Sequence, residues 1–371
     1  MIKALWAGNK FYTGAYPVVG PQSTAQGNFV VDLVKQGLKD TIDTLSVHLT
    51  GNIVQAGSTA GTFTLGAENP QGLLVQATLS SAPQAAGLIP INAVSSRATV
   101  VDYALHQGYF QSNTAYNGTG GPITEVNGGQ TFALDAWFHF KFKRDGAKKG
   151  IDYAHPMYPW NSDLLTLVFG TRNQLVTGGN ETWDMTGVTV ELYADLDIDA
   201  NPDQIHAFEI FEQQFNITAS NPAFIINTLP QGCFYDSLCL VSEDNGVESD
   251  AIITNIDIEG GGRYWLTQGQ ANAEFVRERY TKEQFYDPTA ATHSTGTGLT
   301  GIYAVPLRDG LWSRALDATS QPVVLKLAVN GPGGGHTFNV RLIGRKLVPG
   351  GIKKTVKGAN GAKTVTGLAA A

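Results

Sequence analysis

Long parts of the chain alternate hydrophobic and polar residues with a period of two, which is the pattern of a β-strand that buries one face. In residues 41–54, Leu45, Val47 and Leu49 fall on one face, and mostly polar residues fall on the other. Residues 131–144 show the pattern most clearly. There the residues Phe132, Leu134, Ala136, Phe138, Phe140 and Phe142 share one face, and Asp135, Trp137, His139, Lys141 and Lys143 share the other.

Further β-type runs fill both halves of the chain, at residues 29–34, 73–79, 164–171, 186–196, 205–218, 223–229, 234–242, 252–258, 301–307, 322–329 and 337–347. Two segments differ. Residues 96–110 have helical spacing, with Ser95 or Ser96 as a candidate cap, and the polar residues 270–285 form a second helix candidate. Each half therefore contains strands, one helix, a Gly/Thr-rich loop and more strands. This order predicts an all-β protein of two tandem sandwiches with about eight strands each, jelly rolls or similar.

Composition supports this prediction and excludes several other classes. Charged residues make up 15% of the chain and glycine occurs 43 times, which is typical of many short strands joined by loops and not of a helical bundle or a disordered chain. The net charge is −7, so the folded body as a whole is not expected to bind nucleic acid. No stretch is long and apolar enough for a signal peptide or a transmembrane helix. Cys233 and Cys239 are expected to be buried free thiols.

Both ends of the chain differ from its body. Residues 1–27 form an arm whose aromatic side chains need a surface, either that of the same chain or that of a neighbouring subunit. Residues 349–371 form a tail of Gly, Ala, Thr and Lys that is expected to be flexible. We place the boundary between the two sandwiches in the polar segment near residue 200. The predicted division is therefore an arm (1–27), a first jelly roll (28–200), a second jelly roll (201–348) and a basic tail (349–371).

Three groups of segments resemble a known family. Residues 32–38 lead into the long strand 41–54. Residues 234–258 are followed by Tyr264, Trp265 and a charged helix with Arg277 and Arg279. Residues 301–309, 323–329 and 340–343 form the closing strands. In the order and length of these elements the chain resembles the double jelly-roll major capsid proteins of tailless icosahedral bacteriophages with an internal membrane, which are tectivirus-like and belong to the adenovirus-hexon lineage.

The resemblance implies a fold of two eight-stranded jelly rolls, each with one interrupting helix, and a function in self-assembly. It implies homotrimeric, pseudo-hexagonal capsomers that contact neighbouring capsomers and minor capsid or vertex proteins in an icosahedral shell. The protein would then be part of the virion capsid, assembled in the host cytoplasm, and not an enzyme. The termini would face the internal membrane, where Lys353, Lys354, Lys357 and Lys363 of the tail would meet anionic lipid. The alternative for this tail is a solvated end without a partner.

One local motif suggests a metal site. Asp195, Asp197 and Asp199 alternate as the ligands of a calcium loop do, which makes a structural Ca²⁺ a candidate. However, the sixth position of this loop is Ala200 instead of Gly, and the twelfth is His206 instead of Glu. The alternative is a solvated strand end between the sandwiches. No other cofactor is expected.

The sequence carries no catalytic signature. No histidine pair has zinc-ligand spacing, no nucleophile elbow occurs, and His139 is expected at the surface. The alternative function is a carbohydrate-binding or glycoside-hydrolysing β-sandwich with an aromatic platform and paired carboxylates. Aromatic residues that are candidates for packing or for subunit contacts are Trp137, Trp160, Trp183, Tyr264, Trp265 and Trp312.

Overall fold

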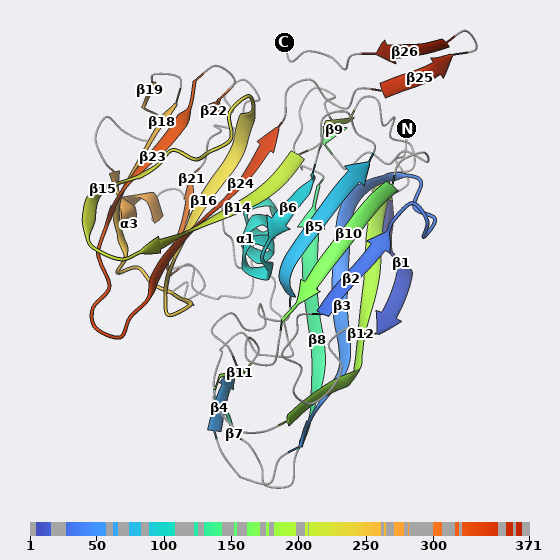
Figure 1. Cartoon of the computed structure of the whole chain (residues 1–371), viewed down its shortest axis with the longest axis horizontal. Coiled ribbons are helices and arrows are strands. Elements are labelled where there is room, and N and C mark those ends of the chain that lie inside the picture. The colour runs from blue at the N-terminus through green and yellow to red at the C-terminus, as the bar shows by residue number, and fades with distance from the viewer. Residues whose placement is uncertain are drawn as a thin grey trace. The chain divides into compact units, whose positions relative to one another are not determined.

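A computed structural model shows an all-β chain with two helices among the residues that it describes (Figure 1). These residues are 5–15, 27–56, 62–65, 74–82, 89–107, 122–124, 130–142, 152–153, 162–170, 176–177, 182–197, 205–206, 208–260, 263–264, 271–277, 281, 300–305, 316–318, 321–347, 354–358 and 361–365. The chain divides into two compact units. The first comprises Met1–Tyr103 and Gln111–Ala207, and the second Ala104–Phe110 and Phe208–Ala371.

The first unit contains two antiparallel sheets. We call one of them sheet A. Its strand order is β1 (Leu5–Ala15), β12 (Thr182–Asp197), β3 (Thr41–Ala56) and β8 (Gln130–Lys141). The other sheet contains, in order, β6 (Ile91–Val94), β5 (Leu74–Ala82), β10 (Ser162–Phe169) and β2 (Gly27–Asp32). Smaller elements are the sheet of β11 (Val176–Thr177), β4 (Thr62–Leu65) and β7 (Pro122–Thr124), and the parallel pair of β13 (Ile205–His206) and β9 (Asp152–Tyr153).

The second unit is also built from two sheets. One contains β17 (Val247–Glu248), β16 (Phe234–Asp244), β24 (Phe338–Leu347) and β14 (Phe208–Ile217), and β21 (Ile302–Val305) and β22 (Leu316–Asp317) pair with β16. The other contains β15 (Asn221–Ile226), β23 (Val323–Val329), β18 (Ile253–Gly260) and β19 (Arg263–Tyr264), and β20 (Ala271–Asn272) pairs with β18. The tail includes a hairpin of β25 (Lys354–Gly358) and β26 (Gly361–Val365), which its composition did not predict.

The alternating pattern of the sequence corresponds to the buried and exposed faces of the strands. On β3 and β8, the predicted inward residues Leu45, Val47, Leu49, Phe138 and Phe140 are buried. In the second unit, the strands of both sheets contribute to one hydrophobic cluster that includes Phe211, Tyr235, Leu238, Leu240, Ile256, Ile258, Leu325, Leu327, Val340 and Leu342. Both cysteines are buried and free, as expected.

The helices confirm one prediction and correct the other. Helix α1 (Ser96–Gln107) lies where the sequence predicts it, and the Ser95 hydroxyl accepts a bond from the backbone N–H of Ala98. The second helix was predicted to begin at residue 270, and this start is wrong, because helix α3 covers Ala273–Val276. The preceding residues pair with β18 as β20, and the Asn272 side chain caps the helix by accepting from the Phe275 N–H. Residues 278–280 and 282–285 lie outside the described part of the chain.

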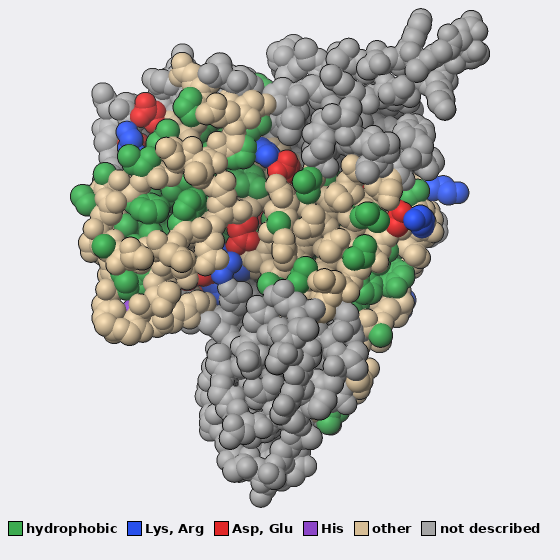
Figure 2. Space-filling view, in the orientation of Figure 1, with side chains coloured by type: hydrophobic (Ala, Val, Ile, Leu, Met, Phe, Trp, Pro, Cys, Tyr) green, Lys and Arg blue, Asp and Glu red, His purple; other side chains and the backbone are tan. Residues whose placement is uncertain are grey.

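The surface carries charges of both signs. Figure 2 shows the described acidic and basic side chains of one face as separate small groups between larger areas of uncharged atoms. No helix among the described residues is long and apolar enough to cross a membrane.

Candidate functional site

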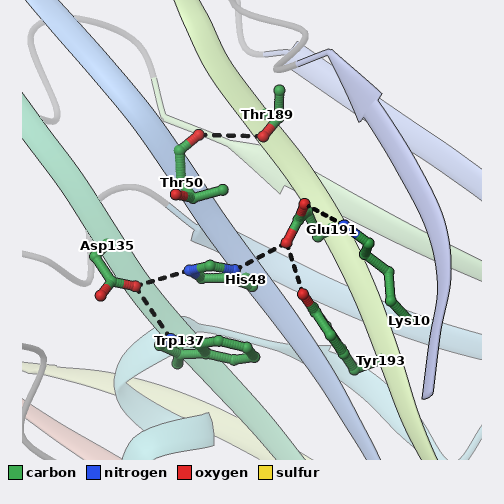
Figure 3. Close-up of polar contacts among 8 residues, drawn as sticks. All are labelled: Lys10, His48, Thr50, Asp135, Trp137, Thr189, Glu191 and Tyr193. Carbon is green, nitrogen blue, oxygen red and sulfur yellow. Dashed lines mark hydrogen bonds and ion pairs between the residues drawn. The ribbon is translucent and has the colours of Figure 1, made fainter. Parts of the chain in front are cut away.

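A group of interacting polar side chains lies on the face of sheet A opposite to its buried residues, such as Val47 and Phe138, and Figure 3 labels eight of these polar residues. We call this face the outer face of sheet A. Its residues alternate along the strands with the buried ones, as the period of two requires. They come from all four strands of the sheet and are Lys10, Ser46, His48, Thr50, Asp135, Trp137, His139, Thr189, Glu191 and Tyr193.

His48 stands at the centre of this group between two carboxylates. Its Nε2 lies 2.7 Å from Oδ1 of Asp135 on β8, and its Nδ1 lies 3.1 Å from Oε2 of Glu191 on β12 (Figure 3). The register of the sheet explains this arrangement, because His48 on β3 lies directly opposite Glu191 on one side and Trp137 on the other. Cross-strand neighbours at such positions are close enough for their side chains to interact.

Glu191 accepts three bonds, and their donors determine its charge. Nζ of Lys10 lies 2.9 Å from Oε1, and the Tyr193 hydroxyl donates to Oε2 at 2.8 Å. The bond from Lys10, supported by those from Tyr193 and His48, lowers the pKa of Glu191 to about 2, although burial opposes this shift. The pKa of Lys10 is raised by the same contact. Glu191 is therefore ionised throughout the neutral and mildly acidic range.

Aromatic rings form a continuous row across the same face. The indole of Trp137 stacks on the His48 ring with centroids 3.8 Å apart and planes 8° apart, and it lies parallel to His139 at 5.8 Å. Tyr193 approaches Trp137 to 5.2 Å, and Tyr103 of α1 approaches His139 to 4.9 Å. The predicted packing role of Trp137 is thus played on the outer face of sheet A and not in the core.

His139 lies on the polar face of β8, as predicted, but its side chain is partly buried there. Tyr103 and Trp137 pack against its ring, and its Nδ1 lies 2.7 Å from the hydroxyl of Ser46. Burial lowers the pKa of His139 to about 4, with the charge of Asp195 acting in the opposite direction. The sequence could not show this, because the residue that covers His139 comes from α1.

This shift predicts that acid destabilises the first unit. Between pH 6.5 and pH 4 the unfolded chain binds a proton at His139 that the folded chain does not bind. The free energy of unfolding therefore decreases as the pH falls through this range, by about 3 kcal/mol in total. The measurement is urea unfolding at several pH values between 4 and 7 for the wild type and for His139→Asn, which replaces the imidazole by a polar side chain that does not titrate.

The variant is expected to lose this part of the pH dependence. A matched control is His336→Asn, because His336 lies in an exposed turn of the second unit, where its Nδ1 contacts Asp244. The control is expected to retain the wild-type slope. An unchanged slope in His139→Asn would contradict the assignment.

The polar residues on the outer face of sheet A interact mainly through ion pairs and hydrogen bonds between strands. A histidine between two carboxylates is able to move a proton, but the nearby hydroxyl of Ser46 contacts His139 and not His48. The described residues contain no group of three or more His, Cys, Asp or Glu side chains arranged to hold a metal ion. The arrangement joins strands through charged hydrogen bonds, and sequence analysis missed it. The only available signal was the recurrence of His, Glu, Tyr and Trp at alternate positions.

The structure describes only part of the segment that is predicted to bind calcium. Asp195 lies on β12 opposite Thr44 and acts electrostatically on His139. Asp197 is the last residue of β12, and only its backbone is described. Asp199 lies outside the described residues. The calcium site stays a prediction, and a calorimetric titration with Ca²⁺ that produces no heat would remove it.

The structure describes parts of both terminal segments. β1 pairs with β12 of the same chain, and Tyr12 packs edge-on against Phe29 with ring centroids 5.3 Å apart. This part of the arm therefore packs against its own chain. Lys354, Lys357 and Lys363 lie in the tail hairpin, where only the backbone is described.

The structure does not describe the side chains of the remaining predicted residues, which are Trp160, Trp183, Tyr264, Trp265, Trp312 and Lys353.

Comparison with known proteins identifies the fold. No protein-family model and no curated protein sequence matches the chain. Solved structures do match. The STIV MCP aligns with a TM-score of 0.58 and 14% identity over 91% of this chain and 97% of that one. The major capsid protein P2 from bacteriophage PM2 aligns at 0.50 and 10% over 94% and 97%, and a chain of the PBCV-1 virus capsid aligns at 0.52 and 9% over 94% and 96%.

These likenesses extend over nearly the whole length of each chain. Together with the two sandwiches and the helix within each half, they show that the chain has the double jelly-roll fold. The prediction of an all-β double jelly roll is confirmed. The matched chains are double jelly-roll capsid proteins, the class to which the sequence showed a resemblance.

Proposed function

We propose that the protein is a major capsid protein whose function is self-assembly into an icosahedral shell. The observation that carries this proposal is the double jelly-roll fold, which the chain shares along almost its entire length with several viral capsid proteins. In this proposal the chain forms trimeric, pseudo-hexagonal capsomers, contacts neighbouring capsomers and minor capsid proteins, and has no enzymatic activity. Its place is the virion capsid after assembly in the host cytoplasm.

The oligomeric state of the purified protein tests this proposal. We expect light scattering on a sizing column to give three times the chain mass of 39.6 kDa, with no dissociation on dilution. Electron microscopy of this species should then show a pseudo-hexagonal outline. A stable monomer that binds sugars in a calorimetric glycan panel would contradict the proposal and favour the carbohydrate-binding alternative.

A second part of the proposal concerns the tail. We infer that Lys353, Lys354, Lys357 and Lys363 contact an internal membrane, because each lysine near an anionic lipid surface contributes about 1 kcal/mol. Co-sedimentation with vesicles containing anionic lipid should decrease when all four lysines are replaced by glutamine. Equal sedimentation of both proteins would remove the membrane contact and leave the capsid proposal intact.

A further inference from the structure

Charged side chains from all four strands of sheet A form one continuous chain. Lys10 on β1 contacts Glu191 on β12, Glu191 contacts His48 on β3, and His48 contacts Asp135 on β8. The distances are 2.9, 3.1 and 2.7 Å. Since β8 is the last strand of the sheet among those that the structure describes, Asp135 is the link that joins this edge to the rest of the chain of charges.

The protonation of His48 decides whether this chain is complete. Ionised carboxylates only accept hydrogen bonds, and a neutral imidazole donates from only one of its two nitrogens. Both contacts of His48 are therefore hydrogen bonds only when both ring nitrogens carry protons. In the neutral ring, one nitrogen presents a lone pair to a carboxylate, and that contact becomes repulsive.

The surroundings of the two carboxylates determine which contact is lost. Glu191 has a side-chain exposure of 13% and is also held by Lys10 and Tyr193. Asp135 has a side-chain exposure of 53%, and it also accepts a hydrogen bond from the indole N–H of Trp137 at 3.1 Å. The neutral ring therefore keeps its proton on Nδ1 for Glu191, and Asp135 turns toward solvent.

The remaining groups around His48 do not change this result. On β8, the Trp137 ring stacks on the imidazole, and His139 lies beyond it in an uncharged state above about pH 4. On β12, the Tyr193 hydroxyl is bonded to Glu191, and on β1 Lys10 reaches His48 only through Glu191. Among the described residues, the charged groups in contact with His48 are thus Asp135 and Glu191.

We propose that protonation of His48 controls how firmly the edge strand β8 is attached to β3 and β12, through the hydrogen bond from His48 to Asp135. With both nitrogens protonated, the imidazole holds Asp135, and Asp135 in turn accepts from the indole of Trp137. When His48 loses a proton, Asp135 turns away, the hydrogen bond from the indole to Asp135 is lost, and the edge of sheet A loosens. Histidine is suited to this role because it is the side chain that commonly changes charge between pH 5 and 8.

The test follows two signals of the full-length protein between pH 5.5 and pH 8.5. The first is the indole N–H resonance of Trp137, which should move with one titration step as its acceptor departs. The second is hydrogen exchange of the peptide containing β8, corrected for the intrinsic pH dependence of exchange. We expect its protection to decrease about two- to fivefold toward high pH, which is the range for partly exposed ion pairs.

Two variants and one control decide the outcome. In His48→Gln, the indole resonance should not titrate, and in Asp135→Asn it should move clearly less than in the wild type, by only the direct effect of the stacked imidazole. In both variants β8 protection should be independent of pH. His336→Gln alters another carboxylate-paired histidine, in the second unit, and should behave as the wild type. The proposal is overturned if the Trp137 resonance is constant in the wild type or titrates equally in Asp135→Asn. Because Asp135→Asn preserves the shape of the side chain, it keeps the test decisive even where His48→Gln does not fold.

Discussion

Replacing Arg341 by methionine is expected to destabilise the second unit by about 3–5 kcal/mol, the usual cost of breaking a buried ion pair from one side. Arg341 lies on β24 between two acidic neighbours. Its Nε donates to both carboxylate oxygens of Glu243 on β16 at 2.9 and 3.0 Å, and its Nη1 donates to Glu212 on β14 at 3.0 Å. The side chains of Arg341, Glu243 and Glu212 are exposed by only 9%, 0% and 8%. Without the guanidinium, the two carboxylates lose these charged hydrogen bonds in a site with little water. Equilibrium unfolding in urea measures the loss.

A matched ion pair in the same unit serves as the control. Nζ of Lys326 on β23 lies 3.4 Å from Oε2 of Glu259 on β18, and both side chains are about one third exposed. Lys326→Met is therefore expected to cost about 0–1 kcal/mol. If both substitutions had the same small effect, burial would not be the factor that makes the Arg341 cluster important.

Gly51→Ala is expected to destabilise the first unit by about 4 kcal/mol, from backbone strain and steric overlap together. Gly51 lies within β3 with a φ of +138°, a conformation that L-residues rarely adopt. A Cβ atom at this position would overlap the backbone carbonyl oxygen of Gly187 on β12. The ladder between β3 and β12 has a register shift between Asp184 and Gly187, next to this contact. Urea unfolding of the variant measures the effect.

Gly37 separates the two causes. It also has a positive φ, of +95°, but no atom lies within 4 Å of a Cβ built on it. Gly37→Ala should therefore show only the backbone cost, about 1–2 kcal/mol. Equal losses in Gly37→Ala and Gly51→Ala would mean that the approach of β12 contributes nothing.

The strands were predictable because their signal is local. Leu45, Val47 and Leu49 are separated from one another by single residues, and this spacing alone assigns them to one face of a strand. The same holds for Phe138 and Phe140. The start of α1 was equally local, since a serine side chain caps the backbone only a few residues ahead.

The group on the outer face of sheet A was not predictable in the same way. Asp135 lies 87 residues and Glu191 lies 143 residues from His48 along the chain. Only the register of β3 with β8 and β12 brings the three residues together. A shift of one residue in either register would turn their side chains to the opposite face. Similarly, the start of α3 depends on the pairing of β20 with β18, which the helical pattern of residues 270–285 does not contain.

The sequence by itself determined that the chain is all-β, where most strands lie, which side of each strand is buried, and that two similar halves follow one another. These properties depend on neighbours within a few residues. Only the tertiary structure decided the strand order, the charged chain from Lys10 to Asp135, the burial of His139 beneath Tyr103, and the close approach of Gly51 to Gly187. The physical reason is that these contacts join residues far apart in the sequence. They form only when the packing of both sheets has set the register between distant strands.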